Sequence, residues 1–256
     1  MALVIPGADF FNGPLVSDFE LFNIMNDVPY KTGLLGSYFL GSKNADPTYN
    51  FANPSLPLLA VGDIPTQNKY STLSRAAYYD TQLLSQTSVT IIVMGRQPAS
   101  GTTGIAVASY FKDGAGTTGD TLMDRWSGST AQVSFYAQSA ATAVTQASRT
   151  TDVVAGGYQV YGALLTESGL TIGTWTMSET TDPGHTDVVM SGRAVSSRTL
   201  RLGATYSDTE FLTASIDLSA VLIYSGNVGS SNMTAVMNWL RNIVGVEAGI
   251  WSAPKA

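Results

Sequence analysis

Short segments in which apolar and polar residues alternate recur along most of this 256-residue chain. In the stretch QVSFYAQ, Val133, Phe135 and Ala137 fall on one side of an extended chain, and the residues between them fall on the other. Period-two alternation is typical of a strand with one face in a core and the other in water. This stretch spans 132–138, and further candidate strands lie at 104–111, 120–126, 158–166, 170–177, 199–205 and 216–224. The run at 89–94 is continuously apolar and β-branched, which fits a strand buried on both faces. Many short strands separated by turn residues favour a β-sandwich or barrel over βαβ units.

Charged residues make up only 12% of the chain, about half of the roughly 25% that is usual for soluble domains. The formal net charge is −6, and there are no cysteines. The few basic residues are scattered and could not neutralise a row of phosphates, so we predict no nucleic-acid partner. No apolar run approaches the roughly 20 residues of a membrane helix. We therefore predict no membrane insertion.

The periodicity changes near the end of the chain. The strand-like IDLSAVLIY at 216–224 is followed by the turn SGNVGSS and then by apolar residues at helical spacing. These residues form one stripe: Met233, Val236, Met237, Leu240 and Val244. We predict a helix near 231–244 that lays this stripe against the sandwich. Ser231 or a neighbouring residue is expected to cap the helix, Gly245 is expected to end it, and 245–256 is expected to be a tail.

Residues 1–32 differ from the rest of the chain. Pro6 and Gly7 interrupt the apolar ALVIPG, and DFELFNIMNDV has the spacing of one or two helical turns. We predict an N-terminal arm over 1–32 that docks on its own domain or on a neighbouring subunit, where it would serve attachment or an oligomer contact. The sandwich is predicted to span 33–244.

Several stretches resemble a known family. They are TSVTIIVMGR, GLLGSYFLGS with the later NPSLPLLAVG, IDLSAVLIYSGNVGSSNMTAVMNWLRNIV, and the opening ALVIPGADF. Over roughly 33–244 they resemble the laminin-G-like (concanavalin A-like) jelly-roll domains, in particular those of tailed-bacteriophage virion proteins. The strand pattern and the resemblance agree on an all-β fold: an antiparallel jelly-roll β-sandwich with one C-terminal amphipathic helix and an N-terminal arm.

The resemblance implies a non-enzymatic structural protein of a tailed-phage virion, either a capsid decoration or minor capsid protein or a tail-fibre or tail-tip component. Its expected partners are other virion proteins and further copies of itself, for example in a homotrimer. It would assemble in the host cytoplasm and be exposed on the particle exterior. Because fold does not fix function, two alternatives stay open. One is a carbohydrate-binding module that recognises host surface glycans, and the other is a glycoside hydrolase of the same fold.

The sequence offers no convincing catalytic group. A retaining glycosidase needs two carboxylates about 5–5.5 Å apart, and a strand pattern E-x-D-x-x-E that would supply them is absent. The nearest pair, Asp208 and Glu210 in YSDTEF, reads as a turn beside a strand. The single histidine, His185, lies in the polar stretch ETTDPGHTD, which we interpret as a solvated loop. We predict that the protein is not an enzyme.

Calcium is a weaker alternative. Domains of the resembling family sometimes hold Ca²⁺ at a loop rim through Asp and Asn side chains and backbone carbonyls. Candidate ligands are Asp46, Asn50, Asp113 and Asp120, none of them with EF-hand spacing. Asp and Asn in such loops usually hydrogen-bond within their own turns. We therefore predict no cofactor and no dedicated metal site, and calcium stays open.

Glycan binding would use an exposed aromatic plane beside hydrogen-bonding side chains. Trp175 has the opposite parity to Leu170 and Ile172, so it should face outward if those two face the core. The other candidate aromatics and polar partners are Trp126, Tyr136, Arg125 and Arg193. Each aromatic could equally pack under the helix, on the second sheet or in a subunit contact.

Overall fold

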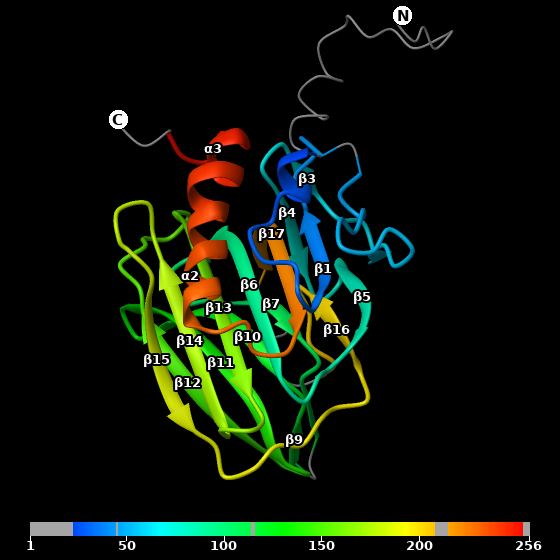
Figure 1. The fold of residues 1–256 in the computed structure, drawn as a ribbon, viewed down its shortest axis with the longest axis vertical. Helices are drawn as coiled ribbons and strands as arrows, with labels where there is room; N and C mark the ends of the chain where they lie inside the picture. The colour runs from blue at the N-terminus through cyan, green and yellow to red at the C-terminus, as the bar shows by residue number, and fades with distance from the viewer. Residues whose placement is uncertain (1–22, 45, 114–115, 208–214, 253–256) are drawn as a thin grey trace, which may run out of the picture.

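The predicted strands pair into two sheets that face each other (Figure 1). The computed structural model describes residues 23–44, 46–113, 116–207 and 215–252. The eight-stranded sheet contains β1 (Leu34–Phe39), β3 (Thr66–Gln67), β4 (Tyr70–Ser74), β6 (Val89–Arg96), β13 (Tyr158–Thr166), β14 (Thr171–Met177), β15 (Gly184–Val189) and β17 (Ser215–Ser225). The seven-stranded sheet contains β2 (Leu59–Val61), β5 (Tyr78–Leu84), β7 (Thr103–Ala108), β10 (Thr121–Ser127), β11 (Thr130–Ala140), β12 (Ala143–Thr150) and β16 (Thr199–Leu202). A hairpin of β8 (Phe111–Asp113) and β9 (Gly116–Thr118) stands apart from both sheets.

The strand order shows that distant parts of the sequence lie side by side. The eight-stranded sheet runs β15-β14-β13-β6-β17-β4-β3, with β1 also paired to β17, and the seven-stranded sheet runs β12-β11-β10-β7-β16-β5-β2. Every pairing described in these two sheets is antiparallel. The predicted all-β antiparallel sandwich is therefore confirmed.

The main core lies between the sheets and follows the alternation seen in the sequence. Val133, Phe135 and Ala137 of β11 are fully buried in it, as predicted. On β6, Ile91 and Val93 belong to the same core. The residues between them are also buried, because β6 lies in the middle of a sheet that is covered on both sides.

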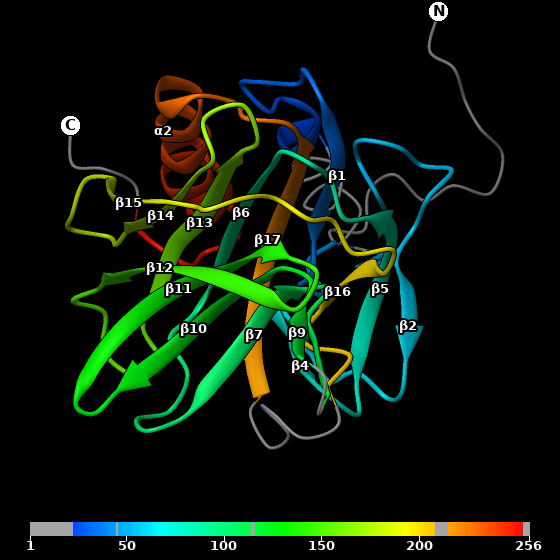
Figure 2. The same cartoon turned by 90° about the horizontal axis from the view of Figure 1, so that it is seen from below.

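A second core covers the outer face of the eight-stranded sheet. The helix α2 (Ser230–Trp239) continues into the π-helical turn η1 (Leu240–Val244) and the short α3 (Gly245–Glu247). The predicted stripe is buried on this face, where it packs with Ile92 and Met94 of β6 and Leu222 of β17. Gly162 of β13 permits the close approach, because a Cβ there would lie 2.5 Å from Cε of Met233. Figure 2 shows the helix on this side only, with β7, β10 and β11 in the other layer.

Both helix ends differ from the prediction. Ser231 does not cap the helix: Gly229 is the N-cap, and no side chain caps it. Gly245 does not end the helix, since its φ of −68° is helical and the chain stays helical to Glu247. Gly245 is needed for packing instead, because a Cβ there would lie 2.3 Å from the ring of Trp251. The segment predicted as a tail is therefore docked on the second core as far as Trp251.

The last part of the predicted N-terminal arm packs on the same face. Residues 23–26 form a helical turn, and Met25 and Val28 are buried in the second core. The hydroxyl of Tyr224 donates to the carbonyl oxygen of Tyr30 at 3.1 Å. The described part of the arm thus docks on its own domain, while residues 1–22 lie outside the described residues. In the described part of the chain, no helix has the length and apolarity needed to cross a membrane.

A buried polar group interrupts the main core. Asp124 of β10 is fully buried, and its Oδ2 accepts a hydrogen bond from Gln159 of β13 across the two sheets. Its Oδ1 has no hydrogen-bond partner among the described residues. Burial raises the pKa of Asp124 well above its usual range, although the hydrogen bond from Gln159 opposes the rise. The folded protein therefore holds this proton to higher pH than the unfolded chain does.

Asp124→Asn should stabilise the protein, since it removes the titrating group and leaves an oxygen for the bond from Gln159. The wild-type free energy of unfolding falls as pH rises from about 4, the pKa of an unfolded aspartate, to the raised pKa of Asp124 in the folded protein. The total loss is about 1.4 kcal/mol for each unit by which folding raises this pKa. The gain in Tm should thus be largest near pH 8 and vanish toward pH 3. Thermal unfolding across this range tests it, with the 94% exposed Asp182 changed to Asn as control. A gain that does not depend on pH would contradict the assignment.

Candidate functional site

Trp175 is not an exposed platform. It points away from the main core, as its parity predicted, but only 4% of it is exposed because the helix covers that face. Its ring stacks on the imidazole of His185 with centroids 4.4 Å apart and planes 15° apart. His185 lies on β15 opposite Trp175, so the predicted loop position was wrong. Its Nε2 is 3.5 Å from Oδ2 of Asp187.

Trp175→Ala should therefore lower stability by about 3–5 kcal/mol, the usual effect of deleting a buried indole. Thermal or urea unfolding measures the change. Trp126→Ala is the matched control, since that indole is only partly buried. A Tm equal to that of the wild type would contradict the buried position of Trp175.

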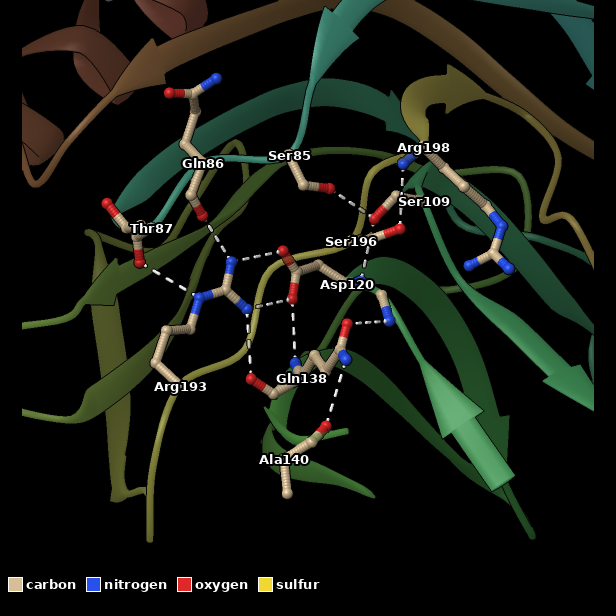
Figure 3. A network of polar contacts seen from close by, with 11 residues as sticks. Ser85, Gln86, Thr87, Ser109, Asp120, Gln138, Ala140, Arg193, Ser196 and Arg198 are labelled. Atoms are coloured by element: carbon tan, nitrogen blue, oxygen red, sulfur yellow. Dashed lines mark hydrogen bonds and ion pairs between the residues drawn. The ribbon is translucent and has the colours of Figure 1, made fainter. Parts of the chain in front are cut away.

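Arg193 is likewise not a surface partner for a ligand. Its Nη1 and Nη2 lie 2.7 and 2.8 Å from Oδ1 and Oδ2 of Asp120, and both side chains are only 3% exposed (Figure 3). The guanidinium also donates to the carbonyl oxygens of Thr87 and Gln86. Oδ1 of Asp120 accepts a further hydrogen bond from the backbone N–H of Gln138 at 2.9 Å. Both oxygens of Asp120 are thus occupied by the protein itself, which argues against the calcium role considered for it.

Breaking this pair should be costly, because a buried carboxylate loses its cation. We expect Arg193→Met to lower stability by about 3–5 kcal/mol. The double variant Arg193→Met with Asp120→Asn removes both charges and should recover part of the loss. Urea unfolding gives the free energy of unfolding of the single and the double variant. If both variants lose the same stability, the unpaired charge of Asp120 is not the cause of the loss.

The other calcium candidates serve local structure. Oδ1 of Asp46 accepts from the amide and hydroxyl of Thr48 at 2.9 and 2.6 Å. Asn50 is buried and bonds to the backbone of Ser37 and Leu35. The side chain of Asp113 lies outside the described residues. Within the part of the chain that the structure describes, no three His, Cys, Asp or Glu side chains are placed to hold a metal ion.

Two of the predicted residues do share an exposed face, namely the outer face of the seven-stranded sheet. Tyr136 of β11 is half-buried there, opposite Thr121 of β10. Arg125 lies further along β10 on the same face, and its Nε donates to Oγ of Ser134 at 3.0 Å. Trp126 points the other way, and its indole N–H donates to the carbonyl oxygen of Pro98.

The same face carries a cluster that the sequence did not suggest. The aromatic–arginine cluster consists of Tyr78, Phe111, Arg198, Arg201 and Tyr206. The guanidinium of Arg201 lies 3.5 Å from the ring centroid of Tyr206 and 4.7 Å from that of Tyr78. Arg198 lies 4.4 Å from the ring centroid of Phe111. These contacts hold the guanidinium planes against aromatic faces at little entropic cost.

Arg201 lacks an acidic partner although one stands directly opposite it. Its cross-strand partner on β5 is Asp80. The carboxylate of Asp80 is already bound, since it accepts from the hydroxyl of Thr199 and from the amide of Gln82, each at 2.8 Å. Gln82 has a φ of 62°, next to a register shift between β16 and β5. The bulge thus turns an amide toward Asp80, and the carboxylate is engaged within β5 and with Thr199.

The outer face therefore carries unpaired positive charge. Among the described residues, Arg125, Arg198 and Arg201 form no ion pair with a carboxylate. Arg193 and Arg96, in contrast, are paired with Asp120 and Asp217 at 2.7 and 2.8 Å. In a chain of net charge −6, three unpaired arginines on one face make it locally suited to anions.

Sheet register sets the distance between the parts of this face. Arg201, Ala108, Thr121 and Tyr136 follow one another across neighbouring strands. Three strand spacings separate Arg201 from Tyr136, which is about 14 Å. A small buried cluster lies between them and contains Ile105, Ala108, Tyr110 and Met123.

The side chains of this face have groups that could bind a sugar. Aromatic rings can stack on the apolar face of a sugar, and guanidinium groups donate paired hydrogen bonds to carboxylates and hydroxyls. Asp80 also lies on this face, and its carboxylate already accepts hydrogen bonds from Gln82 and Thr199. Asp208 and Glu210, the nearest approach to a catalytic pair in the sequence, lie outside the described residues.

Comparison with solved structures identifies the fold. No protein-family model matches the sequence, and no curated protein does. The CBM40 module of a Ruminococcus gnavus IT-sialidase, bound to α2,3 sialyllactose, matches 66% of this chain and 96% of the module with a TM-score of 0.51 and 8% identity. Botulinum neurotoxin type C, a toxin whose cell entry depends on interaction with two ganglioside molecules, has a structure that matches with a TM-score of 0.53 and 10% identity. The serotype D/C binding domain gives 0.53 and 11%.

The two kinds of match differ in extent. Each toxin match covers 84% of this chain but only 52–53% of the toxin chain, so the likeness spans about half of those proteins. At such low identity the likeness concerns the fold alone. It establishes that this protein has the two-sheet, concanavalin A-like β-sandwich fold closed by one C-terminal helix.

Proposed function

We propose that this protein binds carbohydrate, without transforming it, through the outer face of its seven-stranded sheet. The observation that carries the proposal is a group of three arginines on one sheet face without an acidic partner in the described part of the chain. Two of them, Arg198 and Arg201, lie over phenylalanine and tyrosine rings, and Arg125 bonds to Ser134. Paired guanidinium donors and aromatic planes are the two elements that a sugar site requires. The shared fold with a sialyllactose-bound CBM40 module supports this reading.

The glycan is expected to carry a carboxylate. Arg201 presents a planar fork whose bond to its own protein is a long one, from Nη1 to the carbonyl oxygen of Thr205 at 3.5 Å. Its Nε is buried without a partner among the described residues, so a carboxylate would bind through the Nη donors in a bidentate contact. Tyr78 and Tyr206 fix the plane of the guanidinium, so little freedom would be lost on binding. Sialylated oligosaccharides are therefore the first ligands to test.

The role of a structural protein in a tailed-phage virion stays a prediction from the sequence resemblance, as do the homotrimer and the location on the particle exterior. That role is compatible with glycan binding, because a particle that recognises host sugars needs a binding module. No observation on the described residues favours a glycoside hydrolase.

Arg201→Gln should weaken binding of α2,3 sialyllactose about tenfold or more, since charge-assisted hydrogen bonds to the ligand are lost. Arg201→Lys keeps the charge but loses the fork, so it should fall between the wild type and Arg201→Gln. Isothermal titration calorimetry gives the three dissociation constants. Lys31→Gln, an exposed cation beside Tyr30 on the helix side of the molecule, is the control and should bind like the wild type.

Two outcomes would remove the proposal. One is that the wild-type protein binds no acidic oligosaccharide on a glycan array. The other is that Arg201→Gln binds sialyllactose as tightly as the wild type does. Recovery of cleaved sialyllactose after incubation with the wild-type protein would instead contradict the non-enzymatic part.

A further inference from the structure

A polar hollow opens at the edge of the sandwich between β12 and β14, away from the aromatic–arginine cluster. Its volume is about 360 Å³. The edge hollow is lined by Arg149, Thr150, Thr151, Asp152, Thr176, Thr181 and Asp182. Each of these side chains ends in, or carries, a hydrogen-bonding oxygen or nitrogen, so the lining suits a ligand rich in hydroxyl groups.

Arg149 is fixed in the hollow with donors to spare. Its Nε donates to Oγ1 of Thr176 and its Nη1 to the carbonyl oxygen of His185, each at 3.1 Å. A guanidinium has five N–H groups, and the other three have no acceptor among the described residues. Gly184 makes room for the guanidinium, since a Cβ there would lie 2.1 Å from Nη2. No carboxylate of the described chain forms an ion pair with Arg149.

The two aspartates on the rim offer the opposite chemistry. Asp152 is exposed and forms no hydrogen bond or ion pair within the described part of the chain. Asp182 is 94% exposed, and its Oδ1 lies 3.7 Å from Nη2 of Arg241. Ionised carboxylates accept hydrogen bonds and cannot donate them, so they suit the hydroxyl groups of a ligand. Arg149 suits a negatively charged group between them.

We propose that the edge hollow is a second binding site, for a sugar acid: a polyhydroxylated molecule with one carboxylate. The carboxylate pairs with Arg149, and the hydroxyl groups bond to Asp152, Asp182 and the threonine hydroxyls. A simple carboxylate would gain only the pairing with Arg149, and the two aspartates would repel it. A neutral sugar would gain only the hydrogen bonds of its hydroxyl groups to the aspartates and threonines. The proposal does not depend on the glycan site of the outer sheet face, because it rests on different residues.

Site-resolved NMR of the full chain tests this, with sodium glucuronate, glucose and sodium acetate as separate probes. Glucuronate should shift the backbone amides of Thr176, Thr181 and Asp182, and should saturate at about a tenth of the concentration that acetate or glucose needs. Arg149→Gln should raise the glucuronate Kd about tenfold or more. Equal response to all three probes, or to acetate and glucuronate alike, would overturn the proposal.

A second variant separates binding from folding, because Arg149 also anchors β15 through His185. Asp152→Ala alters an exposed side chain and should raise the glucuronate Kd several-fold, whereas acetate, which the rim repels, should bind no more weakly than to the wild type. Arg201→Gln is the matched control and should leave the shifts in the hollow unaltered. If Asp152→Ala binds glucuronate like the wild type, or if Arg201→Gln abolishes the shifts, the assignment fails. None of these glucuronate results tests whether sialyllactose binds at the outer face of the seven-stranded sheet.

Discussion

The covering of the eight-stranded sheet by the terminal segments is the constraint on which the rest of the structure depends. The stripe of α2 and η1, together with Met25 and Val28, buries the outer face of that sheet, while the inner face packs on the other sheet. Burial of apolar area on both sides supplies most of the stabilisation. It also removes one of the two broad sheet faces from contact with a ligand. The outer face of the seven-stranded sheet is the broad strand surface that keeps half-buried polar and aromatic side chains.

The arrangement of charge follows the same division. Two arginines that join distant segments are matched with carboxylates: the buried Arg193 with Asp120, and the partly exposed Arg96 with Asp217. On the outer face, guanidinium groups rest on aromatic rings or hydroxyls instead. An arginine paired with a carboxylate has little to offer a ligand, whereas one fixed by a ring keeps its donors and its charge. Arg96 also lies over the rings of Tyr70 and Tyr158, so the lack of a carboxylate partner within the described ranges, and not the ring contact, sets Arg125, Arg198 and Arg201 apart.

Local patterns predicted the fold well and the site poorly. Alternation in β11 gave the inward set correctly, and the spacing of Met233, Val236 and Leu240 gave the buried stripe. Parity also gave the direction of Trp175, but parity states which face a residue occupies and not what covers that face. The covering helix comes from residues more than fifty positions later. The burial of Trp175 could not be read from its own strand.

The site residues were missed because long-range register brings them together. Arg201 stands at an outward position of an alternating strand, which was a usable signal. Its proximity to Tyr78 and the engagement of Asp80 depend on the pairing of β16 with β5 and on the bulge at Gln82. The ion pair of Arg193 joins residues 73 positions apart. At Gly245, packing of Trp251 decided the conformation, and the local preference of glycine for ending a helix was overridden.

The central claim is that the outer face of the seven-stranded sheet is the one that meets the ligand. The most direct measurement is a map of backbone amide shifts on adding sialyllactose to the full chain. The account predicts shifts on β5, β7, β10, β11 and β16, around Asp80, Arg201 and Tyr136, in addition to any shifts at the edge hollow, since sialic acid is also a sugar acid. Shifts confined to α2 and the strands beneath it, or an absence of shifts at saturating ligand, would contradict it.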